Sequence, residues 1–305
     1  MTRPIFLLTD FGLTDTYVGI VKAVILGIAP AARIVDLIHE ILPQDIRAGA
    51  YALLTAAPYL PADAVVLAVV DPGVGTERRP VAVQAGRRTF IGPDNGLLSW
   101  ALAGAPALPT GTTAVVSTAA ATTVSGVVLD RPAFWLPQIS ATFHGRDIFG
   151  PVAAHVANGV PLTDLGTVTA LDTLTHLPFP AVDRILDATG QLRELRGEII
   201  HVDRYGNLIT NIAGADVPPE PVIGVGGRVG VRLDAHQIRG LSESYQSGPR
   251  PSGADRSGAG PLLALIGSAG FLEVAAPNGS AASIMGATVG TAVVVQSGPA
   301  LPWPP

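Results

Sequence analysis

The sequence contains no cysteine among its 305 residues. This absence excludes disulfide bonds, thiolate metal sites, iron–sulfur clusters and a cysteine nucleophile, and it is compatible with a reducing cytoplasm, where we expect the protein to be located. Charged side chains make up only 14% of the residues and the formal net charge is −5. Because no basic stripe is available to neutralise a run of phosphates, we expect no nucleic-acid partner.

Long hydrophobic runs are also absent, although 48% of the residues are apolar. A membrane-spanning helix needs about 20 consecutive apolar residues, and no window of the sequence approaches that length. The apolar run at residues 4–8 is soon interrupted by Asp10, so we interpret it as a first β-strand and not as a signal peptide. The sequence therefore predicts a soluble protein without membrane association.

The first half of the chain alternates short β-branched runs with helical stretches, which is typical of parallel strands joined by crossover helices. We expect strands at residues 5–9, 33–38 and 64–70, a hairpin of residues 81–84 and 89–91, and a short helix at 95–102. Two further helices are expected, one capped by Thr14 or Asp15 and one opened by Asp45. These elements predict an α/β N-terminal domain with a mainly parallel central sheet.

The second half has short apolar runs between glycine-rich turns, a pattern that indicates an all-β domain. We expect strands at residues 197–203, 208–212, 230–233, 261–266 and 292–295. Because Pro178 and Pro180 stand in a stretch with few periodic apolar positions, we expect domains at 1–178 and 197–305 with a linker at 179–196. The smaller C-terminal domain is predicted to be barrel-like.

Acidic and basic side chains follow several of the predicted strands. In open α/β sheets, ligands bind outside the carboxyl ends of the strands. Asp10 follows the first strand, Asp71 follows the strand at 64–70, and His144 opens a predicted helix. These three residues are candidates for a site.

Each candidate also has a structural explanation. Asp10 precedes a glycine, as an ordinary turn residue does. Asp71 would need a cation, which either Arg78 or Arg79 could supply as a bidentate fork, and such an ion pair can simply stabilise a loop. His144 could be a satisfied structural histidine. Position alone leaves these alternatives open.

Several familiar motifs of other enzyme classes do not occur. The sequence has no phosphate-binding loop, no His-Glu-x-x-His and no Gly-x-Ser-x-Gly, so the anchors of nucleotide triphosphatases, zinc proteases and serine hydrolases are missing. The glycine-rich stretch at 224–230 has the wrong spacing for a dinucleotide fingerprint. We expect neither a metal nor an organic cofactor.

Five motifs nevertheless occur together in one order: Thr-Asp-Phe-Gly at 9–12, Asp-Pro-Gly-Val-Gly-Thr-x-Arg at 71–78, Pro-Asp-Asn-Gly at 93–96, Phe-His-Gly-Arg-Asp at 143–147 and Asp-Arg-Tyr-Gly-Asn at 203–207. This ordered set resembles the S-adenosyl-L-methionine (SAM) hydroxide adenosyltransferase family, which comprises adenosine-forming hydrolases related to fluorinase and chlorinase. The resemblance covers nearly the whole chain and is weakest at 104–140 and 217–260.

The resemblance implies SAM as the substrate and a homotrimer, with active sites between the N-terminal domain of one subunit and the C-terminal domain of a neighbour. The family's catalytic set would correspond to Asp71, Arg78 and His144, and its ribose-binding aspartate to Asp10. Its adenine and methionine contacts would correspond to five residues of the C-terminal domain: Asp203, Tyr205, Asn207, Ser268 and Glu273.

Displacement at a sulfonium carbon needs an aligned nucleophile more than an acid, because the leaving group becomes neutral. We therefore expect the Asp71, Arg78 and His144 set to hold a water in line with C5′. A SAM-dependent halogenase, such as a chlorinase or fluorinase, is the nearest alternative. Three features disfavour it: Asp71 would repel a halide, Gly145 lacks the hydroxyl group that halide pockets use, and the fluorinase-type insertion between the strands around Gly86 is absent. A SAM- or adenosine-binding protein without turnover is the other alternative.

Overall fold

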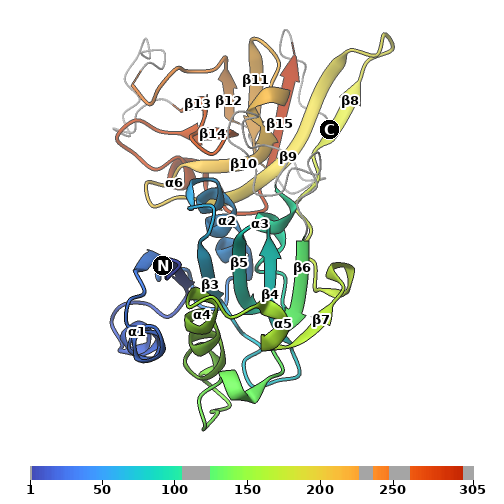
Figure 1. The fold of residues 1–305 in the computed structure, drawn as a ribbon. Coiled ribbons are helices and arrows are strands. Elements are labelled where there is room, and N and C mark those ends of the chain that lie inside the picture. The colour runs from blue at the N-terminus through green and yellow to red at the C-terminus, as the bar shows by residue number, and fades with distance from the viewer. Residues whose placement is uncertain (1, 105–123, 227–235, 247–261, 298–305) are drawn as a thin grey trace. The chain divides into compact units, whose positions relative to one another are not determined.

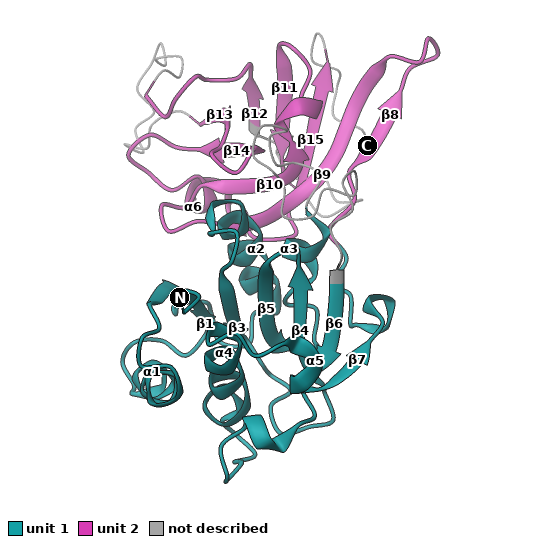
Figure 2. Ribbon diagram, viewed as in Figure 1, with its two compact units in different colours: residues 1–105, 110–178 teal, residues 106–109, 179–305 magenta. Residues whose placement is uncertain are grey.

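The computed structural model describes residues 2–104, 124–226, 236–246 and 262–297 (Figure 1). The chain divides into two compact units (Figure 2). Among the described residues, unit 1 runs to Pro178 and unit 2 begins at Phe179. No helix in these ranges is long and apolar enough to cross a membrane.

Unit 1 is built on a seven-stranded sheet in the order β2-β1-β3-β5-β4-β6-β7. The strands β3, β5, β4 and β6 lie side by side in Figure 1. The strands are β1 (Ile5–Thr9), β2 (Ile34–Ile38), β3 (Val65–Val69), β4 (Pro80–Ala85), β5 (Arg88–Pro93), β6 (Val124–Val128) and β7 (Thr167–Thr169). The neighbouring strands β2, β1, β3 and β5 pair in parallel. The strands β4, β6 and β7 continue the sheet with antiparallel pairing. This mixed, mostly parallel sheet with helices confirms the predicted α/β fold.

Both faces of the sheet are covered, which explains the continuous apolar run of β3. One core contains Ile5 and Leu7 of β1 together with residues of helices α1 (Tyr17–Ile28) and α4 (Gly150–Ala157). The other contains Leu8 with residues of α2 (Ile46–Ala56) and α3 (Ser99–Ala103). The unit also contains the short α-helix α5 (Leu162–Leu165).

Two helix starts differ from the sequence prediction. Helix α1 begins at Tyr17 without a side-chain cap, so the cap predicted at Thr14 or Asp15 is wrong. Helix α3 begins only at Ser99, because Asn95 makes a turn in which its Oδ1 accepts from the backbone N–H of Leu97 at 3.1 Å. The start predicted for α2 is confirmed, since Asp45 is its N-cap and Asp45 Oδ1 accepts from the backbone N–H of Ala48.

Unit 2 is an antiparallel, nearly closed sheet in the order β12-β11-β15-β9-β10-β14-β13, with β8 paired to β9. The strands are β8 (Asp183–Leu186), β9 (Leu192–Val202), β10 (Leu208–Ala213), β11 (Pro221–Val225), β12 (His236–Arg239), β13 (Leu263–Ile266), β14 (Phe271–Ala275) and β15 (Ala292–Ser297). The two terminal strands β12 and β13 contact each other. This arrangement confirms the predicted barrel-like domain, which also carries helix α6 (Ala281–Met285).

The sequence prediction omitted β11, β12 and β14. In β14, the acidic Glu273 interrupts an otherwise apolar run, although it is only 6% exposed. Strand β8 and the start of β9 lie within the range 179–196 that was expected to be a linker. The strand predicted at 230–233 lies outside the described residues.

Candidate active site

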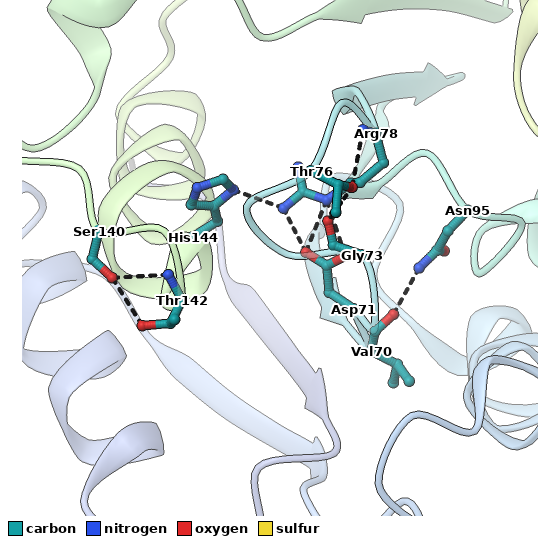
Figure 3. A network of polar contacts seen from close by, with 9 residues as sticks. All are labelled: Val70, Asp71, Gly73, Thr76, Arg78, Asn95, Ser140, Thr142 and His144. Atoms are coloured by element: carbon teal, nitrogen blue, oxygen red, sulfur yellow. Dashed lines mark hydrogen bonds and ion pairs between the residues drawn. The ribbon is translucent and has the colours of Figure 1, made fainter.

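Asp71 and Arg78 stand at opposite ends of the loop that follows β3 and are joined by a two-pronged ion pair (Figure 3). Arg78 Nε donates to both carboxylate oxygens of Asp71, at 3.0 and 2.9 Å, and Nη2 donates to Oδ2. Two tight turns in the loop, closed by Val74 and Thr76 N–H groups, fold the chain back on itself. The side chains of Asp71 and Arg78 are only 5% and 9% exposed, so the pair is largely desolvated.

The adjacent Arg79 does not compete for Asp71. Its Nε donates to Asp94 Oδ2 at 2.8 Å, and its Nη2 donates to the carbonyl of Thr173. Neighbouring residues in an extended chain point to opposite sides, so the two arginines serve different carboxylates. The structure thus decides between the two partners that the sequence left open.

His144 stands directly before a π-helical turn (Gly145–Phe149) that leads into α4. The turn is organised by Asp147, a fully buried carboxylate that accepts from the backbone N–H of Ser140 at 2.7 Å and from Arg146 Nε at 2.6 Å. The Ser140 hydroxyl accepts in turn from the backbone N–H of Thr142 (Figure 3). Asp147 therefore fixes the segment that presents His144.

Arg78 also joins His144 to the ion pair. Its Nη2 lies 2.8 Å from Nδ1 of the imidazole (Figure 3). A guanidinium can only donate, so Nδ1 is the unprotonated, accepting nitrogen and the proton of the neutral ring is on Nε2. Burial and the charge of Arg78 lower the pKa of His144 below its usual value, outweighing Asp71, Asp147 and a backbone hydrogen bond with Ser140, which raise it. This environment therefore favours the neutral form of the imidazole.

A close backbone approach brings the two segments together. Gly75 has a φ of +77°, and a Cβ atom at this position would lie 2.2 Å from the carbonyl oxygen of Ala141. Only glycine fits this conformation and this spacing without strain. The Arg78 guanidinium also lies over the buried ring of Phe149, 5.2 Å from its centroid.

Asp10 lies in the turn after β1, where its Oδ2 accepts from the backbone N–H of Gln44 at 2.7 Å. The next residue, Phe11, packs edge-on against Phe143, with ring centroids 5.8 Å apart. Phe143 immediately precedes His144, so the first motif and the fourth lie side by side in unit 1. Four of the predicted site residues, Asp10, Asp71, Arg78 and His144, thus belong to this unit.

Three further predicted residues form the tight turn between β9 and β10 in unit 2. Asp203 Oδ1 accepts from the backbone N–H groups of Tyr205 and Asn207, both at 2.9 Å, and Oδ2 accepts from the Asn207 amide. The Tyr205 side chain is left 78% exposed. The sequence motif at 203–207 therefore encodes a rigid turn that presents an aromatic ring.

The two remaining predicted residues lie near the connection of β13 and β14, one in the turn and one in β14. Ser268 is exposed at this turn, whereas Glu273 is buried in β14 and accepts from the Tyr245 hydroxyl at 2.7 Å. Burial raises the pKa of Glu273, and the nearby Asp203 adds to this rise, against the lowering effect of the Tyr245 hydrogen bond. Tyr245 is not among the residues that the sequence motifs singled out, because it opens a stretch rich in serine, glycine and proline.

No group of three or more histidine, aspartate or glutamate side chains in the described ranges could hold a metal ion.

Comparison with known sequences identifies the family. The model of the SAM hydroxide adenosyltransferase N-terminal domain matches residues 5–166, and that of the C-terminal domain matches residues 197–294. The chain belongs to the SAM hydroxide adenosyltransferase family. The family resemblance seen in the sequence motifs is thus confirmed.

Three known proteins illustrate what this chain is similar to. A protein of Thermus thermophilus named (R)-S-adenosyl-L-methionine hydrolase is 41% identical over 95% of this chain and 98% of its own length. A protein of Nocardia brasiliensis named fluorinase is more distant, at 26% identity over 97% and 98%. The crystal structure of an uncharacterized conserved protein from Thermotoga maritima superposes with a TM-score of 0.76 and 30% identity, over 96% of this chain and all of the other.

Proposed function

We propose that this chain is an enzyme that hydrolyses SAM to adenosine and L-methionine. The observation that carries the proposal is the contact of Arg78 with both Asp71 and His144, in a member of a family whose Thermus relative is named as such a hydrolase. The same activity was expected from the resemblance of the sequence motifs to this family.

The reaction is a displacement at carbon. The oxygen of a water forms a bond to C5′ of SAM while the bond from C5′ to sulfur breaks, and the electron pair leaves with sulfur as the neutral thioether of methionine. One proton of the water must be removed. Because the leaving group is already activated by its positive charge, alignment and charge stabilisation at the water account for most of the rate.

The three side chains are suited to hold this water. With one carboxylate, one guanidinium and a neutral imidazole, the set carries no net charge and does not repel a sulfonium cation. His144 Nδ1 is occupied by Arg78, so we assign the proton to Asp71. Among the described residues, Oδ1 of Asp71 accepts only from Arg78 Nε and keeps a lone pair for the water.

We further assign the ribose diol to Asp10, and the adenine and methionine contacts to Asp203, Tyr205, Asn207, Ser268 and Glu273. A carboxylate can accept hydrogen bonds from both hydroxyls of a diol. The exposed ring of Tyr205 offers a stacking face for adenine.

We also propose a homotrimer whose active sites combine unit 1 of one subunit with unit 2 of a neighbour, located in the cytoplasm. Exposed apolar side chains along helix α1 support self-association, because Tyr17, Ile20 and Leu26 are 48%, 36% and 43% exposed. Exposed apolar side chains of this kind are typical of subunit interfaces. The mass of the purified protein in solution tests the assembly.

Halogenation is disfavoured by the surroundings of Gly145. Gly145 cannot supply the hydroxyl group that a halide pocket uses. A Cβ atom at this position would lie 3.0 Å from Cζ of Phe11, so a side chain with a hydroxyl group would crowd that ring. The carboxylate of Asp71 would in addition repel a halide ion.

The purified protein should release adenosine and methionine from SAM, and in ¹⁸O-labelled water the label should appear in the 5′-hydroxyl of adenosine. The variants His144→Ala and Asp71→Ala should bind SAM but lose most turnover. Formation of a 5′-halogenated nucleoside in the presence of halide would identify a halogenase instead. Binding without turnover would identify a binding protein.

A further inference from the structure

Two consecutive residues at the end of β5 hold both ends of the loop that carries Asp71 and Arg78. At the first end, Asn95 Nδ2 donates to the carbonyl of Val70 at 2.8 Å (Figure 3). Asn95 is itself fixed, because its Oδ1 accepts from the backbone N–H of Leu97. Val70 is fully buried and immediately precedes Asp71.

At the second end, Asp94 holds Arg79, which immediately follows Arg78. The backbone N–H of Asp94 donates to the carbonyl of Arg79 at 2.9 Å, and Arg79 Nε donates to Asp94 Oδ2 at 2.8 Å. The other oxygen, Oδ1, accepts from the backbone N–H of Thr175 at 2.7 Å. The Asp94 side chain is only 5% exposed.

The sheet alone does not hold the loop at its first end. The parallel pairing of β3 with β5 extends only to Leu67 and Ile91, and its pairing with β1 on the other side extends to Val69 and Thr9, so Val70 and Asp71 lie beyond both ladders. The side-chain amide of Asn95 supplies a hydrogen bond to the strand end where both ladders have stopped. A buried carbonyl without this donor would be left unsatisfied, which is costly.

We propose that Asn95 is a positioning residue for the Asp71 and Arg78 pair, with Asp94 holding the opposite end of the same loop. Asn95 acts through the backbone of Val70 and does not contact the reacting atoms. The proposal rests on the function proposed above, because it gives the clamp its catalytic purpose. A misplacement of about 1 Å in a site of this kind can reduce a rate about 100-fold.

The test uses two substitutions at Asn95 and one matched control. Asn95→Ala removes the donor without adding charge, and Asn95→Asp keeps the shape but cannot donate. Asn158→Asp is the control, because Asn158 Nδ2 also donates to a backbone carbonyl, that of Ile28, at 3.1 Å, between helices on the same unit. Both Asn95 variants should lower kcat for SAM hydrolysis about 10- to 100-fold with KM within about threefold, whereas Asn158→Asp should change kcat less than about twofold.

A second measurement does not depend on turnover. The pKa of His144, followed by NMR, should rise in Asn95→Ala, because Arg78 moves away from the imidazole and its lowering effect is larger than the opposing effect of Asp71. If the wild-type protein released no adenosine, the proposed function would fail, but this titration would still decide whether Asn95 positions Arg78.

Four results would overturn the proposal. The first is an unchanged kcat and an unchanged His144 pKa in Asn95→Ala, and the second is a change in KM without a change in kcat. The third is an equal loss of kcat in Asn158→Asp, and the fourth is a loss of kcat in Asn95→Asp alone, which would assign the effect to charge. If circular dichroism showed that both Asn95 variants fail to fold, Asn95 would have a purely structural role, and the proposal would also be overturned.

Discussion

Nη2 of Arg78 lies 2.8 Å from Nδ1 of His144. Because the same nitrogen also donates to Asp71, one guanidinium links a carboxylate from the loop after β3 to an imidazole from the start of the π-helical turn. This contact determines the tautomer of His144 and places a cation at the centre of the proposed catalytic set. Most of the tests of the site therefore concern this contact.

Replacing Arg78 by lysine should lower kcat about 100-fold. An ammonium group keeps the charge but cannot donate to both oxygens of Asp71 and to His144 in one plane. Steady-state kinetics would measure the loss. Arg88→Lys provides the control, since Arg88 at the start of β5 donates to the carbonyl of Pro61 and does not contact the loop of Asp71 and Arg78. A drop of similar size there would contradict a specific role for Arg78.

Activity should persist into mildly acidic solution and fall only below about pH 6.5, because the lowered pKa of His144 keeps the imidazole neutral and able to accept from Arg78. The kcat/KM profile of the free enzyme reports this pKa. An acidic limb centred above pH 6.5 would contradict the assignment of His144.

Stability should change with pH in the same range. The unfolded chain binds a proton at His144 as the pH falls through about 6.5, whereas the folded protein resists it, so the free energy of unfolding decreases as the pH falls. His155, whose pKa is lowered by burial, contributes in the same direction. Denaturation at several pH values should show a smaller decrease for His144→Asn than for the wild type.

Substituting Gly75 by alanine should both destabilise the protein and lower kcat. The new Cβ atom would collide with the Ala141 carbonyl oxygen, in addition to the cost of a positive φ, which is about 1–3 kcal/mol. The loop must then move away from the segment before His144, and Arg78 moves with it.

Gly159→Ala separates these two effects. Gly159 has a φ of +95° but open space around its Cβ position, so this variant should lose stability and retain its kcat. Denaturant melts and kinetics on both variants are compared. Equal kinetic behaviour would show that the approach of Gly75 to Ala141 has no part in catalysis.

Replacing Asp10 by alanine should weaken SAM binding about 10- to 100-fold and change kcat much less, because two hydrogen bonds to a diol act in the ground state as well as in the transition state. Isothermal titration calorimetry measures the affinity. Asp45→Ala removes the nearby cap of α2 and should cost stability while leaving affinity unchanged. An Asp10→Ala variant of unaltered affinity would count against the ribose assignment.

The sequence was sufficient for much of the architecture. Apolar runs such as β3 and alternating helices indicated the α/β unit, and glycine-rich turns indicated the all-β unit, because these patterns depend only on local periodicity. Strand β14 was missed where Glu273 interrupts the pattern. The start of α3 was placed too early because a side-chain turn at Asn95 replaces the first helical residues.

By itself the sequence determined the fold class, the family and the identity of the candidate residues, since ordered motifs and periodicity are properties of the linear chain. It could not decide which arginine pairs with Asp71, which nitrogen of His144 carries the proton, or that Asn95 holds the strand end before Asp71. These relations join residues from 7 to 66 positions apart. They are decided only when the sheet register, the turn at Gly75 and the desolvation of the pair bring the side chains within hydrogen-bonding distance.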